Sequence, residues 1–179
     1  MIYKGNNTYR LNSCETIEMF YNLRVDLEKL NYASYITKII LDVTEENQNS
    51  YKILQLFLNT LYTISETDKN IDLIIAIFKI RLICILGYTP NISQCVECGE
   101  KDELMYFSFR DNGFKCGICA KQDTSVFQIS EVTKDAIKYI VLSPAKKLFS
   151  FNIPEYAIKE LEIVAKIYFN EKLEKDYKM

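Results

Sequence analysis

Apolar residues recur every three to four positions over long stretches of this chain, which is the spacing that places them on one face of an α-helix. Three long helices are therefore predicted in the first half, at residues 24–44, 50–65 and 70–86. Gly87 follows the third stretch and Pro90 comes soon after, so this helix is expected to end at the glycine. The three helices are expected to pack as an antiparallel bundle.

Two further helices are predicted in the C-terminal third of the chain. Ser130 is a favourable cap for a helix that carries Ile137, and Pro144 is expected to end it. The last helix is expected to begin near Pro154 and to continue to about residue 175, because apolar residues keep a helical spacing over that range. Its apolar face is expected to dock on the bundle.

Strand signals also mark the N-terminus. Residues 2–11 predict a β-hairpin, with its turn at Gly5, Asn6 and Asn7. Asn12 has an acidic residue three positions later, at Glu15, and this pair resembles a capping box. A short helix is therefore expected to begin at Asn12.

Four of the six cysteines form two Cys-x-x-Cys pairs in the middle of the chain. The pairs are Cys95 with Cys98 and Cys116 with Cys119. Two such pairs at this separation are typical of a tetrahedral site in which four thiolates hold one structural zinc ion. The sequence therefore predicts a zinc-binding insertion in the helical bundle.

The residues between and after the two pairs predict strands. Residues 104–110 alternate and are rich in aromatic side chains, and residues 111–113 are turn formers, so a β-hairpin is expected to connect one pair to the other. A last short strand is predicted at 126–129. Together these features describe a zinc ribbon over about residues 92–129.

Disulfides and a redox pair are the alternative interpretations of these cysteines. The N-terminus has no signal segment, so the chain is expected to stay in a reducing cytosol, where disulfides rarely persist. The sequence contains no histidine, whereas a catalytic zinc site usually has histidine ligands and an open position. A structural four-Cys zinc site is therefore favoured over disulfides and over a redox pair.

Composition supports a mainly helical single core. The 179 residues are 49% hydrophobic and include only 5 Gly and 3 Pro, too few turn formers for an all-β fold. The longest apolar segment, 71–86, is interrupted by Asp72, Lys79 and Arg81, so it predicts a buried helix and not a membrane span.

The charge balance limits the expected binding of nucleic acid. The chain carries 22 Lys plus Arg against 24 Asp plus Glu, which gives a formal net charge of −2. Contacts between cationic side chains and phosphates supply much of the affinity of DNA-binding proteins. DNA binding by this chain is therefore expected to be weak and sensitive to salt.

Several segments together resemble the bacterial RecO family of DNA repair proteins. The resemblance covers nearly the whole chain, and its most specific part is the apolar helix that leads through Leu-Gly-Tyr into the paired cysteines. The matching segments are Leu23-Arg24, Asp26-Leu-Glu28, Tyr32-Ala-Ser-Tyr35, Phe78 to Pro90, Cys95-x-x-Cys98-Gly99, Tyr106-Phe-Ser108, Gly113, Cys116-x-x-Cys119 and Ile129-Ser130.

The resemblance implies a non-enzymatic mediator of homologous recombination in the bacterial cytoplasm, associated with the nucleoid. RecO-like proteins bind single-stranded DNA and the acidic tail of the single-stranded-DNA-binding protein SSB. They also partner with RecR to load a recombinase, and they anneal complementary strands. A groove for the SSB tail needs apolar walls and one or two cations. Lys79 and Arg81 are the candidate cations, although Arg81 is as well explained by an ion pair beside the core.

The family also implies a domain division. RecO-like proteins begin with an oligonucleotide-binding (OB) β-barrel, and residues 1–12 resemble the remnant of its last strands. Residues 13–179 resemble the helical domain with its zinc-binding insertion. Most of the barrel is therefore expected to be absent from this chain.

Two other function classes stay open from the sequence. One is an unrelated zinc-ribbon protein that binds nucleic acid, for which tight oligonucleotide binding with a steep salt dependence would be evidence. The other is a cytosolic enzyme. The chain has no histidine and no phosphate-binding glycine loop, so no catalytic residue can be nominated.

Overall fold

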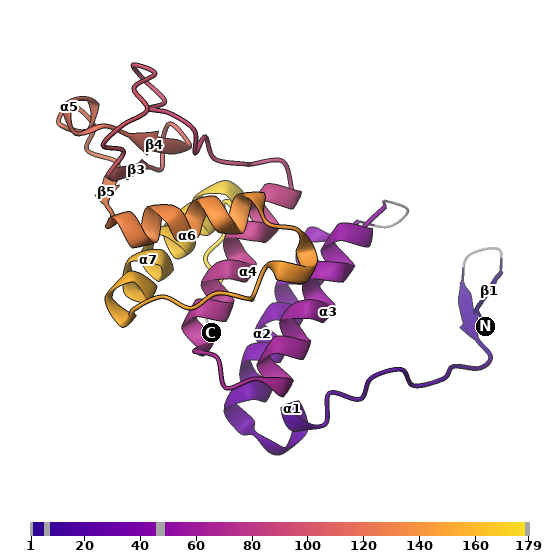
Figure 1. Cartoon of the computed structure of the whole chain (residues 1–179). Helices are drawn as coiled ribbons and strands as arrows, with labels where there is room; N and C mark the ends of the chain where they lie inside the picture. The colour runs from indigo at the N-terminus through magenta and orange to yellow at the C-terminus, as the bar shows by residue number, and fades with distance from the viewer. Residues whose placement is uncertain (1, 6–7, 46–48, 178–179) are drawn as a thin grey trace.

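The structure is a computed structural model that describes residues 2–5, 8–45 and 49–177 (Figure 1). It confirms a mainly helical fold with a small four-Cys ribbon and an N-terminal hairpin. The helices are α1 (Asn22–Val25), α2 (Leu27–Val43), α3 (Tyr51–Glu66), α4 (Ile71–Ile85), α5 (Gly117–Ala120), α6 (Glu131–Leu142), the 3-10 helix η1 (Ala145–Lys147) and α7 (Glu155–Leu173). The strands are β1 (Ile2–Lys4), β2 (Tyr9–Leu11), β3 (Tyr106–Ser108), β4 (Gly113–Lys115) and β5 (Val126–Gln128).

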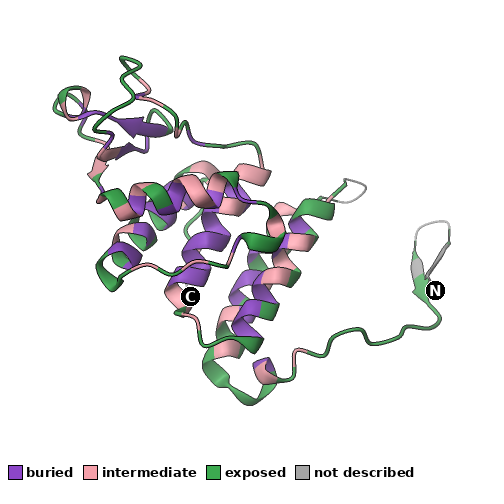
Figure 2. Ribbon diagram, in the orientation of Figure 1, coloured by how far each residue is buried: buried purple, intermediate pink, exposed green. Residues whose placement is uncertain are grey.

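Helix α4 is the centre of the helical body. Helices α3, α6 and α7 all pack against it, and Figure 2 shows most of its length as buried. Leu73 to Ile80 are buried without interruption, so the helix has no exposed face over two turns. A helix that is apolar all round is stable only inside a protein core, as the sequence predicted for this segment.

The predicted end of α4 at Gly87 is confirmed. Gly87 has a φ of +100°, a backbone conformation that glycine adopts without a steric penalty. Its N–H donates to the Cys84 carbonyl at 3.2 Å, and the Tyr88 N–H donates to the Ile83 carbonyl at 3.0 Å. This is the Schellman arrangement, which satisfies carbonyls that the helix end would otherwise leave unpaired.

The first long helix is not continuous, contrary to the sequence prediction for residues 24–44. Asp26 has an extended backbone that separates α1 from α2. Its carboxylate accepts hydrogen bonds from the N–H groups of Glu28 and Lys29, at 2.9 and 3.1 Å. Capping of this kind stabilises the start of α2 and outweighs the continuation of one helix through the aspartate.

The start of α6 confirms the predicted cap at Ser130. The hydroxyl of Ser130 accepts a hydrogen bond from the Thr133 N–H at 3.3 Å. Glu160 of α7 completes the cap, because its carboxylate accepts from the Ser130 N–H and hydroxyl, both at 2.8 Å, and from the Thr133 hydroxyl at 2.6 Å. One carboxylate thus joins the start of α6 to α7.

We expect Glu160→Gln to lower the free energy of unfolding at pH 7 by about 1 kcal/mol, because the hydrogen bonds lose their charged acceptor. Burial alone would raise the pKa of Glu160, but the hydrogen bonds from Thr133 and Ser130 hold it below its ordinary value. A lowered carboxyl pKa stabilises the fold above the unfolded value of about 4.3, and this contribution disappears as the pH falls through the folded pKa.

Urea unfolding of both proteins between pH 7 and pH 3 measures this effect as a difference. The stability gap between the unmodified chain and Glu160→Gln should narrow below about pH 4. Glu162→Gln, an exposed change on the same helix, is the control and should show no such gap. A gap that stays constant with pH would contradict the proposed role of the charge.

The N-terminal hairpin is confirmed as two antiparallel strands, with Ile2 opposite Leu11 and Lys4 opposite Tyr9. The Gly5 N–H donates to the Thr8 carbonyl at 2.7 Å. The other two predicted turn residues, Asn6 and Asn7, lie outside the described residues. Figure 1 shows the hairpin held away from the helical body by an extended segment.

The short helix expected at Asn12 is wrong. The segment between Leu11 and Tyr21 contains no helix, and Ile17 is 99% exposed. A helix of a few residues needs a surface on which to bury an apolar face, since its nucleation is unfavourable in isolation. Residues 12–19 are all exposed and bury no apolar face, and the capping pair of Asn12 and Glu15 does not compensate.

The ribbon is a three-stranded antiparallel sheet with the order β4-β3-β5. The predicted hairpin is present with shorter strands, and the predicted last strand pairs with β3. Gly113 at the start of β4 lies against the preceding loop, where a Cβ atom would stand 2.5 Å from the Asn91 carbonyl oxygen. The close approach therefore requires a glycine at this position.

The ribbon rests on the helical body through α7. The ring of Phe107 packs against that of Tyr168 with 5.2 Å between centroids. The Tyr168 hydroxyl donates to the Tyr88 carbonyl at 2.9 Å, and the Lys172 ammonium donates to the Phe109 carbonyl at 3.3 Å.

Among the described helices, none has the length and apolar character needed to cross a membrane.

Candidate metal centre

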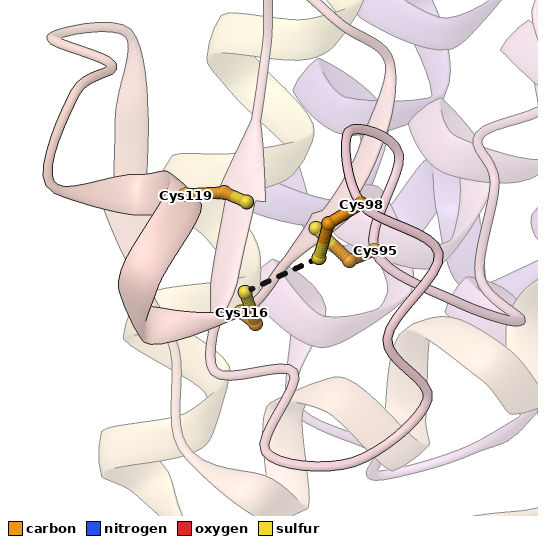
Figure 3. A group of neighbouring side chains, drawn as sticks. All are labelled: Cys95, Cys98, Cys116 and Cys119. Carbon is orange, nitrogen blue, oxygen red and sulfur yellow. Dashed lines mark hydrogen bonds between the residues drawn. The ribbon is translucent and has the colours of Figure 1, made fainter.

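The structure brings the four predicted cysteine ligands together. Cys95 and Cys98 lie in the loop between α4 and β3, Cys116 directly precedes α5, and Cys119 lies within that helix. Figure 3 shows the side chains facing one another. All four sulfur atoms lie within 4.8 Å of one another, and those of Cys98 and Cys116 are 3.8 Å apart.

These distances fit a single tetrahedral metal ion. With metal–sulfur bonds of about 2.3 Å, the sulfurs of a tetrahedral site stand about 3.8 Å apart. A disulfide would need about 2.05 Å, and all four thiols are free. The four side chains can therefore hold one metal ion with little movement.

The environment of Cys95 favours a thiolate. Burial alone would raise the pKa of this thiol, but hydrogen bonds from the backbone N–H groups of Cys98, Cys116 and Glu97 lower it to about 6. The pKa of Cys119 is instead raised, by desolvation and by the neighbouring sulfurs. Four thiolates this close repel one another, so a fully ionised set requires a cation between them.

A buried ion cluster lies beside the cysteines. The Lys115 ammonium is 2.6 Å from the Asp111 carboxylate, 2.9 Å from that of Asp123 and 3.0 Å from that of Glu97. The side chains of Lys115 and Asp123 are each 1% exposed. Despite burial, these partners raise the pKa of Lys115 above its ordinary value, and hydrogen bonds from Ser125 and Lys115 lower that of Asp123.

Sequence reasoning missed this cluster. Its carboxylates come from three loops, so no spacing along the chain connects them to Lys115. The one local signal is a lysine that directly precedes a metal-ligand cysteine within a short strand.

The two predicted partner-binding cations, Lys79 and Arg81, lie in different places. Lys79 is 9% exposed, and its ammonium lies over the rings of Tyr35 and Phe169, at 5.4 and 5.9 Å from their centroids. Burial lowers its pKa. The Arg81 guanidinium donates to the carbonyls of Ile140 and Val141, at 3.0 and 2.7 Å, and so holds the last turn of α6.

Arg81 also lines a cavity of about 200 Å³ between α3 and η1. An adjoining hollow of about 460 Å³ shares three of its lining residues. Together they form what we call the α3–η1 groove, and no carboxylate is among its described lining residues. The groove is lined by Lys52, Gln55, Leu56, Asn59, Tyr62, Thr63, Arg81, Ile85, Ala145, Lys146, Leu148, Phe149 and Ser150.

Comparison with known proteins gives consistent matches over almost the whole chain. The family model for the C-terminal part of recombination protein O matches residues 24–179. The DNA repair protein RecO of Acetivibrio thermocellus is 44% identical over 178 residues, which cover 99% of this chain and 71% of that protein. The DNA repair protein RecO of Thermoanaerobacter sp. (strain X514) is 31% identical over 99% of this chain and 72% of that protein. The protein of the same name from Alkaliphilus metalliredigens is 28% identical over 94% of this chain and 69% of that protein.

Proposed function

Since this chain belongs to the RecO family of DNA repair proteins, we propose that it acts as a non-enzymatic recombination mediator. In this role it helps to load a recombinase onto single-stranded DNA coated with SSB and promotes the annealing of complementary strands. The observation that carries the proposal is the α3–η1 groove, which combines apolar walls with cations. Such a surface suits a protein partner better than it suits a chemical reaction.

The partner proposed for the groove is the acidic tail of SSB, which ends in a hydrophobic residue. Leu56, Ile85 and Leu148 give the cavity apolar walls for that terminal side chain. Lys52 and Lys146 flank it and complement the tail's carboxylates. The hydrogen bonds that Arg81 makes to α6 fix its guanidinium beside the cavity, so this cation contributes without losing much conformational freedom.

Of the two cations that the sequence nominated, only Arg81 enters this proposal. The Lys79 ammonium is buried against two aromatic rings, and Lys79 is not among the residues that line the groove. Residues two apart on a helix point in different directions. We therefore propose that Lys79 stabilises the packing of α4. Lys52 and Lys146, and not Lys79, contact the carboxylates of the SSB tail.

Fluorescence anisotropy of a labelled SSB tail peptide tests this site. We expect saturable binding that is lost when the terminal hydrophobic residue is removed. Lys52→Glu and Lys146→Glu should each weaken binding about tenfold, because each replaces an attraction with a repulsion. Lys159→Glu on the exposed face of α7 is the matched control and should bind like the unmodified chain. Equal binding by all four proteins would remove the groove from the proposal.

The ion proposed for the four-Cys site is one structural zinc. Four thiolates without histidine or an open position are the donor set of closed zinc sites. When bound, such an ion supplies folding stability and no chemistry. Cys95, Cys98, Cys116 and Cys119 would hold it, and of these Cys95 and Cys116 are buried and Cys98 is exposed.

The domain division remains a proposal. We propose that residues 1–12 are the remnant β-hairpin of an OB-like domain and that residues 13–179 form the RecO-like helical domain with its insertion at about 92–129. The separate position of the hairpin in Figure 1 supports this division, since an isolated two-stranded hairpin is only marginally stable. With a net charge of −2, this chain alone should bind single-stranded DNA weakly. The contact with RecR and the association with the nucleoid rest on the family resemblance.

A further inference from the structure

The ion cluster around Lys115 connects every part of the ribbon that carries a cysteine. Lys115 is the last residue of β4 and directly precedes Cys116. Its ammonium contacts Glu97, which lies between the two cysteines of the first pair, at 3.0 Å. It also contacts Asp123, which follows α5 and the second pair, at 2.9 Å. One side chain thus reaches both cysteine pairs.

Asp123 extends these connections into the sheet. Its carboxylate accepts a hydrogen bond from the Ser108 hydroxyl of β3 at 2.8 Å. It also accepts from the N–H and hydroxyl of Ser125, at 2.8 and 2.7 Å. Asp111, in the turn between β3 and β4, is 2.6 Å from Lys115 and closes the cluster on the remaining side. The ammonium is therefore fixed in one position relative to the strands and both loops.

Because the Lys115 ammonium is buried, its stability depends on these carboxylate contacts. An ammonium that is 1% exposed has lost its water and depends on its carboxylate partners for compensation. Displacing the loop that carries Asp123 would take away the one carboxylate partner that is fully buried with the ammonium, and displacing the loop that carries Glu97 would take away another contact. None of these contacts involves a cysteine sulfur, so the sulfur atoms stay available as metal ligands.

From these contacts we propose that Lys115 is a positioning residue for the four-Cys site, which holds the two cysteine pairs at metal-binding distance before the ion arrives. The inference rests on the metal site proposed above and adds a residue that acts through the ligands. A preformed site loses less conformational entropy on binding, and groups that orient metal ligands commonly contribute 10- to 100-fold in affinity.

Glu97→Gln tests the link to the first cysteine pair. This carboxylate is half-exposed, so its replacement leaves Lys115 with two carboxylate partners, Asp111 and the buried Asp123, and the ribbon folded. We expect zinc affinity, measured by competition with a chromophoric chelator, to fall about tenfold. Glu100→Gln is the matched control, because Glu100 lies in the same loop and its carboxylate caps only the N–H groups of Lys101 and Asp102.

Lys115→Arg and Lys115→Met test the ammonium itself. The arginine variant keeps the charge and is expected to recover most of the affinity that the methionine variant loses. Co²⁺ serves as a spectroscopic probe, because its absorption bands report whether four thiolates surround the ion in a tetrahedral arrangement. Glu97→Gln should also show weaker absorption bands at sub-saturating Co²⁺. The melting temperature of the helical body in the metal-loaded protein should stay unchanged.

The outcomes separate this inference from the metal proposal. Zinc affinities of Glu97→Gln and Lys115→Met that both match the unmodified chain would overturn the positioning role while leaving the metal site intact. An unmodified chain that binds neither Zn²⁺ nor Co²⁺ would overturn the metal site itself. If Lys115→Met fails to fold, the comparison of Glu97→Gln with Glu100→Gln still decides the question.

Discussion

Cys98→Ser is expected to abolish metal binding and to unfold the ribbon, which is the largest effect that we expect from any single substitution. Structural zinc contributes about 10 to 16 kcal/mol of binding free energy, and in a small module this is folding free energy. Cys98 is exposed, so the change to serine disturbs no core packing and acts through the lost ligand. Metal content and the near-ultraviolet circular dichroism of the aromatic side chains measure both consequences.

Cys14→Ser is the matched control for this experiment. Cys14 is also exposed, but it lies in the extended segment outside the cluster, so this variant should keep one metal ion per chain and its melting temperature. Removal of the metal by a chelator should reproduce the Cys98→Ser result in the unmodified chain. An unmodified chain that is free of metal, with a melting curve that the chelator does not alter, would contradict the assignment.

Phe107→Ala is expected to lower the free energy of unfolding by about 3 to 5 kcal/mol, the second largest effect. Phe107 is 1% exposed and packs against Phe109, Phe114 and Tyr168, with ring centroids 5.4, 6.1 and 5.2 Å away. Its removal leaves a cavity where the ribbon meets α7. Urea unfolding followed by circular dichroism measures the loss.

The Phe107 ring also joins the ribbon to the helical body, so Phe107→Ala should weaken their coupling. Separate unfolding transitions for metal release and for loss of helix are expected in this variant. Phe127→Ala is the matched control, since Phe127 is opposite Phe107 on the neighbouring strand but is only partly buried. A loss for Phe107→Ala no larger than that for Phe127→Ala would show that the junction with α7 contributes little.

Features that depend on neighbouring residues were predictable from the sequence. The end of α4 at Gly87 and the cap at Ser130 are local, because each is set by the backbone preference or hydrogen bonding of one residue. The four ligand candidates were predictable for the same reason, since the spacing within each Cys-x-x-Cys pair already fixes much of its geometry.

Features that depend on distant contacts were not predictable. The capping pair of Asn12 and Glu15 suits a helix start locally, but residues 12–19 are exposed and bury no apolar face against the rest of the protein. The cluster around Lys115 requires three loops to fold together before its carboxylates meet. Periodicity also could not orient Lys79 and Arg81, because α4 is apolar around its whole circumference and shows no polar face.

The central position of α4 has a consequence for the newly made chain. Its packing partners α6 and α7 lie beyond the ribbon in sequence, so α4 leaves the ribosome well before they do. At a translation rate of roughly 5 to 20 residues per second, the part of its apolar surface that faces α6 and α7 stays uncovered for several seconds. During that interval a chaperone that shields hydrophobic segments would have its main binding site on this helix, and chains halted within the ribbon would be the ones most prone to aggregate.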